Sequence, residues 1–477
     1  MAAGEHRWPV VSRRHFLQVS AVSAVALACA PEPSPSPAAP TPTPGAQPTP
    51  AARPTAAAER PAAPTLTAMP TEAPSPAPNR QPGVLYRDAA LADGRSPDLQ
   101  VGVSVLVEDG RVTWIRPSDA EEDPGPREGL EVVDASGSTI VPGMVDCHSH
   151  LTMPGGAHWI ERGGDAPERL LSYAEHNARL MMGAGVFWAR DVGAPRGVDP
   201  LDGRERALSL GVRDRWHGRR EYPYVRAAGT WLTRAGSLPP GLTVGVESAA
   251  ELLSAALAQL DDGANFVKLY LDGPDPGSSP WSVAEVRQVV EAVRGRGARL
   301  TAHSGRLDGA RVGAEAGVDS LEHGFELDTD VCRTMASNGV RLVSTLTVLR
   351  SWLSFGRTTR IPRFASDDGR RTVEARRERA IESVRLAHAA GVAICAGTDF
   401  GGGSARANQL AWEVESLVEA GLEPWQALAA ATWRGGELLG EADAGVLREG
   451  GPADFFLVHG DPLSDPAALW RVWRTSR

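Results

Sequence analysis

The sequence predicts an α/β protein in which a (β/α)8 TIM barrel carries a small β-sandwich domain built from both ends of the folded region. Three observations lead to this prediction. Strand-like and helix-like runs alternate eight times between residues 143 and 441, β-rich segments flank that region on both sides, and no glycine-rich phosphate turn follows an early strand. A doubly wound open sheet, the alternative, would be expected to contain such a turn.

The barrel strands are predicted from short apolar runs bounded by turn residues, and the helices from apolar residues three or four positions apart. Strands are expected at 143–147, 186–191, 225–229, 266–271, 298–303, 320–323, 341–345 and 392–398. Helices are expected between them, for example at 247–259, 283–294, 306–317 and 373–390.

The flanking segments, residues 83–142 and 442–477, are expected to pair with each other in the β-sandwich. The runs 103–107 and 112–115 are joined by Glu108-Asp109-Gly110, which is a hairpin signal. Further strands are expected at 130–134, 138–141, 445–447, 453–458 and 471–473.

Composition narrows the class of function. The formal net charge is -10 and no run is dense in Lys or Arg, which argues against a nucleic-acid partner. No apolar stretch approaches the ~20 residues that a membrane-spanning helix needs. The 4 cysteines are too scattered for a disulfide framework. We therefore expect a small-molecule substrate as the partner, and a homo-oligomer is also compatible with the sequence.

Residues 1–29 are interpreted as a targeting segment. Ser12-Arg13-Arg14-His15-Phe16-Leu17 precedes a short apolar run and resembles a twin-arginine export signal, whereas the alternative is a cytoplasmic N-terminal helix. Ala26-Leu27-Ala28-Cys29 resembles a lipoprotein cleavage box, although a larger aliphatic residue usually stands where Ala26 does. Lipidation of Cys29 would anchor the protein to a membrane at the cell surface or in the periplasm. Ordinary signal-peptidase cleavage is the alternative.

Residues 30–82 are expected to be a disordered linker. The segment consists mostly of Pro, Ala, Ser and Thr, a composition that buries too little apolar surface to fold. An extended proline-rich chain of this length reaches at most about 160 Å, at ~3.1 Å per residue. With a lipid at Cys29, such a spacer would hold the folded region away from a membrane.

Polar residues with metal-binding chemistry recur at the predicted carboxyl ends of the barrel strands, where active sites of this fold form. Side chains two apart on a strand share a face, so the two histidines that end the first strand converge. Imidazoles, a lysine and a carboxylate from five strands would meet at one mouth: His148, His150, Lys268, His303, His323 and Asp399. Independent accidents are an improbable explanation for such a set.

The same motifs resemble those of metal-dependent amidohydrolases, close to the imidazolonepropionase and Xaa-Pro dipeptidase branch. The resemblance runs in order from about Val84 to Arg477. It rests on the sequences around Val141–His150, Arg190-Asp191-Val192-Gly193, Phe266-Val267-Lys268, Asp319–Gly324, Gly397-Thr398-Asp399 and Gly451-Pro452-Ala453-Asp454.

This resemblance implies two divalent metal ions, and Zn²⁺ is the expected metal. His148, His150 and Asp399 would bind one ion, and His303 and His323 the other. Lys268 would be carboxylated on its amine and bridge them, because a free ammonium between two dications would be repelled whereas a carbamate offers anionic oxygen. The alternative is an uncarboxylated Lys268 beside a single metal ion.

The implied mechanism is hydrolysis by a hydroxide that bridges the two metal ions, with Asp399 as the proton shuttle to the leaving nitrogen. The predicted enzyme is a hydrolase that cleaves an amide-type C–N bond of a dipeptide, an N-acyl amino acid or a cyclic amide. One alternative is a lactone or phosphoester hydrolase that uses the same metal pair. Another is a non-catalytic metal- or solute-binding lipoprotein, but a binding protein would not need Asp399.

Substrate contacts are harder to predict than metal ligands. Arg234, Tyr270 and His158 are candidates, and the arginine-rich segment 349–371, interpreted as a loop, is either solvated or binds a substrate carboxylate. Arg190-Asp191 is expected to be a buried pair that fixes a loop, and contact with the substrate is the alternative. Ala235-Gly236-Ser237 stands where dipeptidase-like relatives carry Gly-Gly-His, so dipeptidase specificity does not follow.

Overall fold

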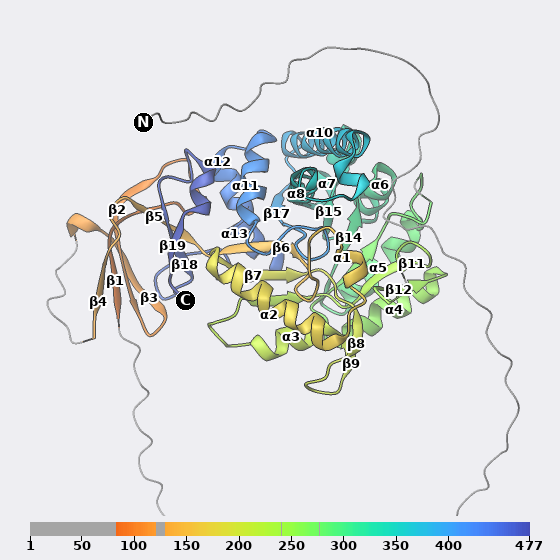
Figure 1. Ribbon diagram of the computed structural model, residues 1–477, viewed down its shortest axis with the longest axis horizontal. Coiled ribbons are helices and arrows are strands. Elements are labelled where there is room, and N and C mark those ends of the chain that lie inside the picture. Colours follow the sequence, from red (N-terminus) through yellow and green to blue (C-terminus); the bar gives the residue numbers. More distant parts are fainter. Residues whose placement is uncertain (1–82, 121–128, 240, 276) are drawn as a thin grey trace, which may run out of the picture.

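The computed structural model describes residues 83–120, 129–239, 241–275 and 277–477 (Figure 1). The targeting segment 1–29, including Cys29, and the linker 30–82 lie outside the described residues. Among the residues that are described, no helix is both long and apolar enough to cross a bilayer.

The central part is an α/β structure of parallel strands. One sheet has the order β10-β7-β6, and a second has the order β12-β11-β13-β14-β15-β16-β17. Backbone bridges join the two sheets at Ala228–Phe266 and at Ser149–Phe400. The strands are β6 (Met144–Ser149), β7 (Val186–Asp191), β10 (Tyr224–Ala227), β11 (Trp231–Arg234), β12 (Thr243–Val246), β13 (Phe266–Tyr270), β14 (Arg299–Ser304), β15 (Ser320–His323), β16 (Arg341–Ser344) and β17 (Ile394–Ala396).

Eight of these strands correspond to the eight predicted ones, and β7 and β15 have the predicted bounds. Strands β11 and β12 were not predicted. They lie in the segment after β10, and β11 pairs with both β12 and β13. The arrangement is an α/β fold like a TIM barrel.

Helices lie around these strands (Figure 1). Ser282 and Glu285 form a capping box at the start of α5, and α6 and α7 end at Gly317 and Gly339, whose φ angles of 75° and 68° are left-handed. The helices are α1 (Trp159–Arg162), α2 (Pro167–Gly183), α3 (Leu208–Trp216), α4 (Ala249–Asp261), α5 (Val283–Gly295), α6 (Leu307–Ala316), α7 (Thr329–Asn338), α8 (Leu346–Phe355), α9 (Pro362–Ala365), α10 (Asp367–Ala389), α11 (Leu410–Glu419), α12 (Pro424–Ala430) and α13 (Trp433–Leu439).

The interpretation of residues 349–371 as a loop was wrong. Most of the segment belongs to α8, α9 and the first turn of α10. Helix α8 buries Leu346, Val348 and Leu349. Its short apolar face, and not the surrounding arginines, therefore determines the conformation of this segment.

A separate seven-stranded sheet combines both ends of the folded region, with the order β19-β18-β5-β1-β2-β3 and with β4 beside β1. Figure 1 shows these strands gathered to one side of the helices, the C-terminal β18 and β19 next to N-terminal strands. The sheet has its own core, which includes Tyr86, Val105, Ile140 and Phe455. The strands are β1 (Val84–Leu91), β2 (Gln100–Glu108), β3 (Arg111–Pro117), β4 (Glu131–Asp134), β5 (Ser138–Pro142), β18 (Phe455–His459) and β19 (Val472–Thr475).

The predicted hairpin is present as antiparallel β2 and β3. Residues 445–447, in contrast, are not a strand: Gly445 has a left-handed φ of 70° and lies against the backbone of Thr432, where a β-carbon would not fit. The sandwich form of this domain stays a prediction. The remaining elements are the short pair β8 (Arg196–Val198) and β9 (Glu205–Ala207) and the 3-10 turns η1 (Ser118–Ala120) and η2 (Pro466–Trp470).

Candidate metal centre

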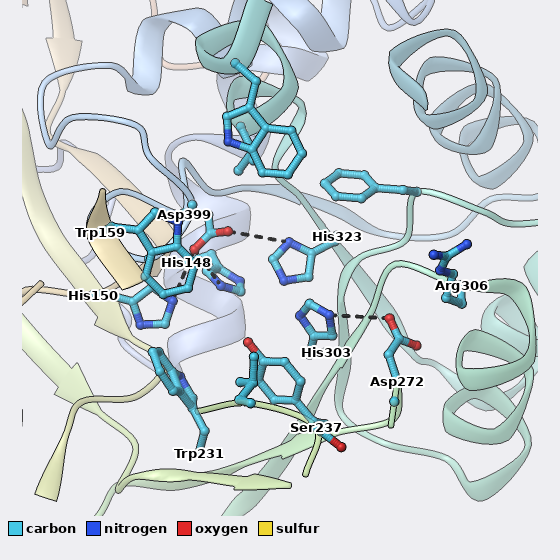
Figure 2. A pocket seen from close by; sticks show the side chains of 18 of the residues that line it. His148, His150, Trp159, Trp231, Ser237, Asp272, His303, Arg306, His323 and Asp399 are labelled. Carbon is cyan, nitrogen blue, oxygen red and sulfur yellow. Dashed lines mark ion pairs between the residues drawn. The ribbon is translucent and has the colours of Figure 1, made fainter. Parts of the chain in front are cut away.

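The first two predicted ligands lie at the end of β6, where His148 and His150 border one cavity (Figure 2). His148 Nδ1 is 2.6 Å from Oε2 of Glu322, and His150 Nδ1 is 2.8 Å from the carbonyl oxygen of Gly193. These acceptors favour a proton on each Nδ1, which leaves the lone pair on each Nε2 available. Both Nε2 atoms face Asp399, at 3.5 and 3.1 Å from its Oδ1.

His323 and Asp399 complete a compact cluster with His148. One nitrogen or oxygen atom from each of the three lies within 4.8 Å of those of the other two, and all three residues are buried. His323 and Asp399 have left-handed φ angles of 71° and 54°, which are uncommon for residues with side chains. Such backbone strain is concentrated at functional sites. The hydroxyl of Thr345 is 2.8 Å from Nδ1 of His323 and fixes the ring.

Lys268 on β13 is buried, its charge acts on His148 and His323, and its Nζ has no hydrogen-bond partner among the described residues. Burial lowers the pKa of the Lys268 ammonium to about 8, although the nearby carboxylates of Glu322 and Asp399 act in the opposite direction. A buried amine with this pKa is partly neutral near pH 7. Lys268 is also the only lysine in the sequence, since every other basic side chain of the Lys and Arg count is arginine.

His303 at the end of β14 lies on the other side of the cluster. Its ring stacks on Tyr270 at a centroid distance of 4.1 Å and approaches His323 at 4.4 Å. Nε2 of His303 is 3.4 Å from Oδ2 of Asp272, while its buried Nδ1 has no partner among the described residues. One ring nitrogen thus has a carboxylate neighbour, and the other is available for a ligand.

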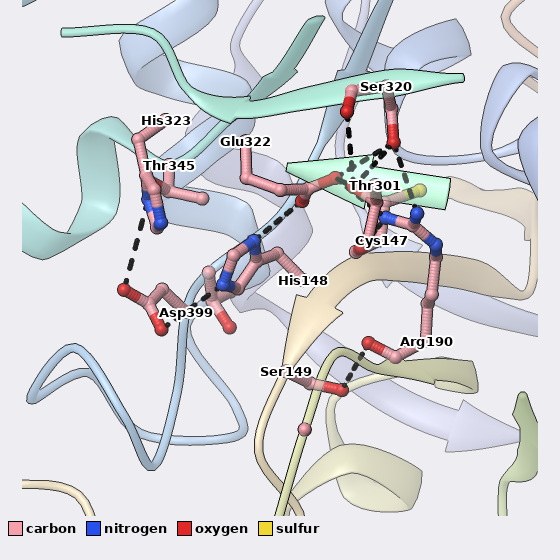
Figure 3. Close-up of polar contacts among 12 residues, drawn as sticks. Cys147, His148, Ser149, Arg190, Thr301, Ser320, Glu322, His323, Thr345 and Asp399 are labelled. Atoms are coloured by element: carbon pink, nitrogen blue, oxygen red, sulfur yellow. Dashed lines mark hydrogen bonds and ion pairs between the residues drawn. The ribbon is translucent and has the colours of Figure 1, made fainter. Parts of the chain in front are cut away.

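Glu322 is a site residue to which sequence reasoning gave no role. Its carboxylate contacts His148 and accepts hydrogen bonds from Arg190, Ser320 and Thr301 (Figure 3). Burial alone would raise its pKa, but the charges of Arg190 and Lys268 and the hydrogen bonds outweigh burial, so that the pKa is lowered. A carboxylate that orients a histidine from behind is typical of metal sites. The only sequence signal is its position next to His323.

His148 and His323 are held neutral by their surroundings. Burial is the largest cause that lowers the pKa of His148 and of His323, and the charges of Lys268 and of neighbouring histidines act in the same direction. Neutral imidazole is the form that binds metal. Unprotonated ring nitrogens are therefore expected near pH 7.

Glycines allow the loop after β17 to pack against these side chains. A β-carbon on Gly402 would overlap the ring of His150, and one on Gly403 would overlap the carboxylate of Asp399. Gly397 similarly lies against His148. The Gly-rich stretch that follows Asp399 is therefore a packing requirement of the site.

Comparison with known proteins agrees with this geometry. The model of the amidohydrolase family matches residues 139–474. The chain belongs to this family. It is 28% identical over 382 residues to an uncharacterized protein of Mycobacterium tuberculosis, a match that covers 78% of this chain and 90% of that protein. It is 27% identical over 411 residues to the imidazolonepropionase of Anaeromyxobacter dehalogenans, covering 78% of this chain and 89% of that protein.

The structure of a Xaa-Pro dipeptidase with bound methionine is similar in fold, with a TM-score of 0.69 and 23% identity over 82% of this chain and 98% of that one. The predicted membership in the amidohydrolases, with imidazolonepropionase and dipeptidase relatives, is thus confirmed. As a member of the family, the protein is a hydrolase that acts on carbon–nitrogen bonds.

The donor set of this amidohydrolase fits a divalent metal site. His148, His323 and Asp399 form the candidate site, and two further buried atoms, Nζ of Lys268 and Nδ1 of His303, have no partner among the described residues. Buried polar atoms without partners are costly unless a ligand satisfies them. Nitrogen and carboxylate donors of this kind suit Zn²⁺.

The cavity above the cluster has an empty volume of about 1010 Å³, including space open to solvent, which suits a small substrate. Tyr270 is part of its wall. Arg234 is not, because it binds Glu247 and covers the ring of Trp281. The side chain of His158 is 68% exposed, 3.9 Å from Glu161, and also lies outside the wall. Substrate contacts by these three residues stay predictions.

Arg190 and Asp191 are buried and do not border the cavity. Asp191 accepts hydrogen bonds from the backbone N–H groups of Leu151 and Gly193 at 2.7 and 3.1 Å, and so fixes the loop that follows β6. Asp191 thus fixes a loop, as expected, whereas Arg190 hydrogen-bonds to Glu322 and Ser320 instead of pairing with Asp191. None of the arginines in residues 349–371 borders the cavity either.

Proposed function

We propose that this protein is an exported, binuclear metallohydrolase that cleaves an amide-type C–N bond of a small substrate, such as a dipeptide, an N-acyl amino acid or a cyclic amide. The observation that carries the proposal is the buried amine of Lys268, which has no hydrogen-bond partner among the described residues and whose charge acts on both His148 and His323. A lone buried ammonium is unstable beside metal-binding groups, whereas its carbamate would be an anionic ligand.

In this proposal His148, His150 and Asp399 would hold one Zn²⁺ ion and His303 and His323 another, and Lys268, carboxylated on its amine, would supply an anionic ligand shared by the two. When bound, the ions would polarise the scissile carbonyl and lower the pKa of water. The proton that the leaving nitrogen needs would be delivered by a side chain of the protein. Asp399 Oδ1 lies 3.5 Å from Nε2 of His148 and 3.1 Å from Nε2 of His150, and we assign this carboxylate the transfer of a proton to the leaving nitrogen.

The proposal extends to the rest of the chain. The bridges at Ala228–Phe266 and Ser149–Phe400 support closure of the eight strands into a barrel. The Arg13-Arg14 motif supports export by the twin-arginine route, and Cys29 is the proposed lipid anchor at a membrane facing the periplasm or the cell exterior.

The test is hydrolysis by the full chain loaded with Zn²⁺, assayed on dipeptides, N-acyl amino acids and cyclic amides. Lactones and phosphoesters in the same panel examine the alternative activity. Asp399→Asn should lower kcat by about 10²–10⁴-fold, the range for a positioned proton-transfer group. Asp367→Asn is the matched control, because its side chain is 79% exposed on α10.

Two outcomes would contradict the proposal. Turnover of amides that is equal in Asp399→Asn and the parent would exclude the assigned proton transfer. Turnover of lactones or phosphoesters without any amide turnover would assign the metal pair to the alternative reaction. A metal content of two per chain is expected, and one per chain would exclude the bridged site.

A further inference from the structure

His303 differs from the other three candidate histidine ligands in its exposure and in the nitrogen that makes its supporting contact. Its side chain is 22% exposed, whereas those of the other three are at most 4% exposed. The other three make this contact through Nδ1: His148 with Glu322, His150 with the carbonyl oxygen of Gly193 and His323 with the hydroxyl of Thr345. In His303 it is Nε2 that has a polar neighbour, and the buried Nδ1 has no partner among the described residues. Burial therefore fixes this ring least.

The contacts around the His303 ring fix its plane and its direction separately. Tyr270 stacks on the ring with an angle of 7° between the two planes, and His323 meets it edge to face. A half turn of the imidazole about its bond to Cβ keeps the same plane, so stacking does not determine where the nitrogens point. The carboxylate of Asp272 does distinguish the two directions, because its Oδ2 lies 3.4 Å from Nε2 (Figure 2). A carboxylate attracts a ring N–H, which favours a proton on Nε2 and a lone pair on Nδ1.

The carboxylate of Asp272 is itself held in place. The hydroxyl of Ser304 donates a hydrogen bond to its Oδ1 at 2.9 Å, and the backbone N–H of Gly305 donates one to its Oδ2 at 2.6 Å. A glycine on α6 makes room for it, since a β-carbon on Gly309 would lie only 2.7 Å from Oδ1. Ser304 and Gly305 directly follow His303, so Asp272 contacts three consecutive residues at the end of β14. A side chain with such support is able to hold a neighbouring ring in one orientation.

We infer that Asp272 is a positioning residue, which holds His303 with Nδ1 toward the second metal position, the one assigned to His303 and His323. This rests on the proposed function, because the second metal ion is part of that proposal. Asp272 acts through the ring of His303 and takes no part in proton transfer. Its loss should therefore weaken binding of the second ion and leave the ion assigned to the other ligands in place.

The first experiment measures Zn²⁺ binding by the full chain, as the number of ions per chain and their affinities in competition with a chromogenic chelator. Asp272→Leu is similar in size but has no acceptor oxygen. It should weaken one of the two ions by about 10–100-fold, the usual effect of removing a residue that supports a ligand, and leave the other unchanged. Asp272→Asn keeps an acceptor oxygen and should restore part of the loss.

Two further variants control this comparison. Ser304→Ala removes one hydrogen bond to Asp272 and should weaken the same ion by less than Asp272→Leu does. Asp330→Asn, whose side chain is 82% exposed on α7, should change neither ion. If Asp272→Leu does not fold, Asp272→Asn and Ser304→Ala provide the same test, because each should still weaken one ion and not the other.

The second experiment needs no metal. Long-range ¹H–¹⁵N NMR of the metal-free full chain, labelled in its histidines, reports which ring nitrogen carries the proton. The signals of His303 are those that are missing in His303→Gln. We expect a proton on Nε2 in the parent and a mixture of both forms in Asp272→Leu. A role of Asp272 in folding alone would lower the temperature of unfolding without changing these signals.

The outcomes separate this inference from the proposed function. Two ions of unchanged affinity in Asp272→Leu, or a proton on Nδ1 of His303 in the parent, would overturn the positioning role and leave the proposed function intact. A single ion per chain in the parent would contradict the proposed function instead. The NMR comparison would then decide the role of Asp272, which a proton fixed on Nε2 in the parent but not in Asp272→Leu would support and equal spectra would exclude.

Discussion

Two buried polar clusters lie at opposite ends of the barrel-like strands, and only one of them has the composition of a ligand site. At the carboxyl ends, Lys268 and His303 have buried nitrogens without partners among the described residues. At the amino ends, Arg477 and Asp454 are buried between the seven-stranded sheet and the start of β10, and both have atoms without hydrogen bonds there. Unsatisfied atoms alone therefore do not distinguish the two clusters.

Their charges do. Asp454 and Arg477 are opposite charges whose Oδ1 and Nε atoms are 3.3 Å apart, and the guanidinium lies 4.3 Å from the ring centroid of Tyr224 and 5.5 Å from that of Phe187. This pair neutralises itself. The other cluster combines His148 and His323, whose pKa values are lowered, with Lys268 and Asp399, and His148, His323 and Asp399 place one ligand atom each within 4.8 Å of one another. Such a donor set suits an added cation. The donor set, and not burial, marks the functional region.

Replacement of Lys268 is expected to have the largest effect. Lys268→Met keeps the length of the side chain but removes the proposed bridging ligand, so under the proposed function the metal content should fall from two ions per chain to one or none. Hydrolysis should fall by at least about 10³-fold, as expected when the generator of the nucleophile is lost. Metal analysis of the purified full chain measures the first effect.

Lys268→Arg is the informative control, because it keeps the positive charge but offers no amine that reacts with CO₂. If Lys268→Arg retained two ions per chain, the bridging role would be excluded. Thermal unfolding of both variants without metal should resemble that of the metal-free parent.

Breaking the other cluster should affect stability without affecting metal content. Arg477→Met leaves Asp454 buried without its partner, which costs about 3–5 kcal/mol in the free energy of unfolding. Arg471→Met, whose ion pair with Asp465 is about half exposed, should cost less than about 1 kcal/mol. Denaturant unfolding of the full chain compares the two. Loss of metal in Arg477→Met would contradict the separation of the two regions.

The deficit of Arg477→Met should also depend on pH. Burial raises the pKa of Asp454, while Arg477 and Arg220 lower it. Without Arg477, the pKa of Asp454 in the folded state rises further above its pKa in the unfolded state. At pH values between these two pKa values, the folded state therefore binds more protons than the unfolded state. The free energy of unfolding then falls as pH rises through that window, and the deficit should shrink toward pH 4.

Much of the metal cluster could be predicted from sequence because it is encoded locally. His148 and His150 are two residues apart at the end of β6. His303, His323 and Asp399 lie at or just after the ends of apolar strands, and Lys268 lies within one. The same local logic located β7 and β15 correctly. It also produced the incorrect strand at 445–447, where a Gly-Val-Leu triplet is too short to carry a real pattern.

Features that depend on tertiary packing could not be predicted. Glu322 contacts His148 across 174 residues of sequence, and no local pattern pairs them. Trp159, Trp231 and Trp352 reach the cavity from a short helix, an unpredicted strand and a segment interpreted as a loop. One signal was present and was not used: the only lysine of the sequence lies within a strand, β13, among the parallel strands that carry the other ligands.

The smallest predicted effect is the pH dependence of carbamate formation on Lys268. Because Lys268 is the only lysine in the sequence, a carbamate signal from a lysine can come from this residue alone. With a pKa of about 8, about a tenth of the Lys268 amine is neutral at pH 7, against about 1 in 3000 for an ordinary lysine. The neutral amine attacks CO₂, a new N–C bond forms and a proton is released, so carbamate should increase as pH rises from about 6 to 8.5.

Carbon-13 NMR of the full chain in ¹³C-bicarbonate should show the resonance of the carbamate carbon, and Zn²⁺ should strengthen it. The resonance should be missing in Lys268→Arg, because that variant has no lysine and its only remaining amine is the α-amino group of the chain. A signal of equal intensity in that variant, or none in the Zn²⁺-loaded parent, would remove the carbamate from the site and leave the two polar clusters distinguished by histidines and Asp399 alone.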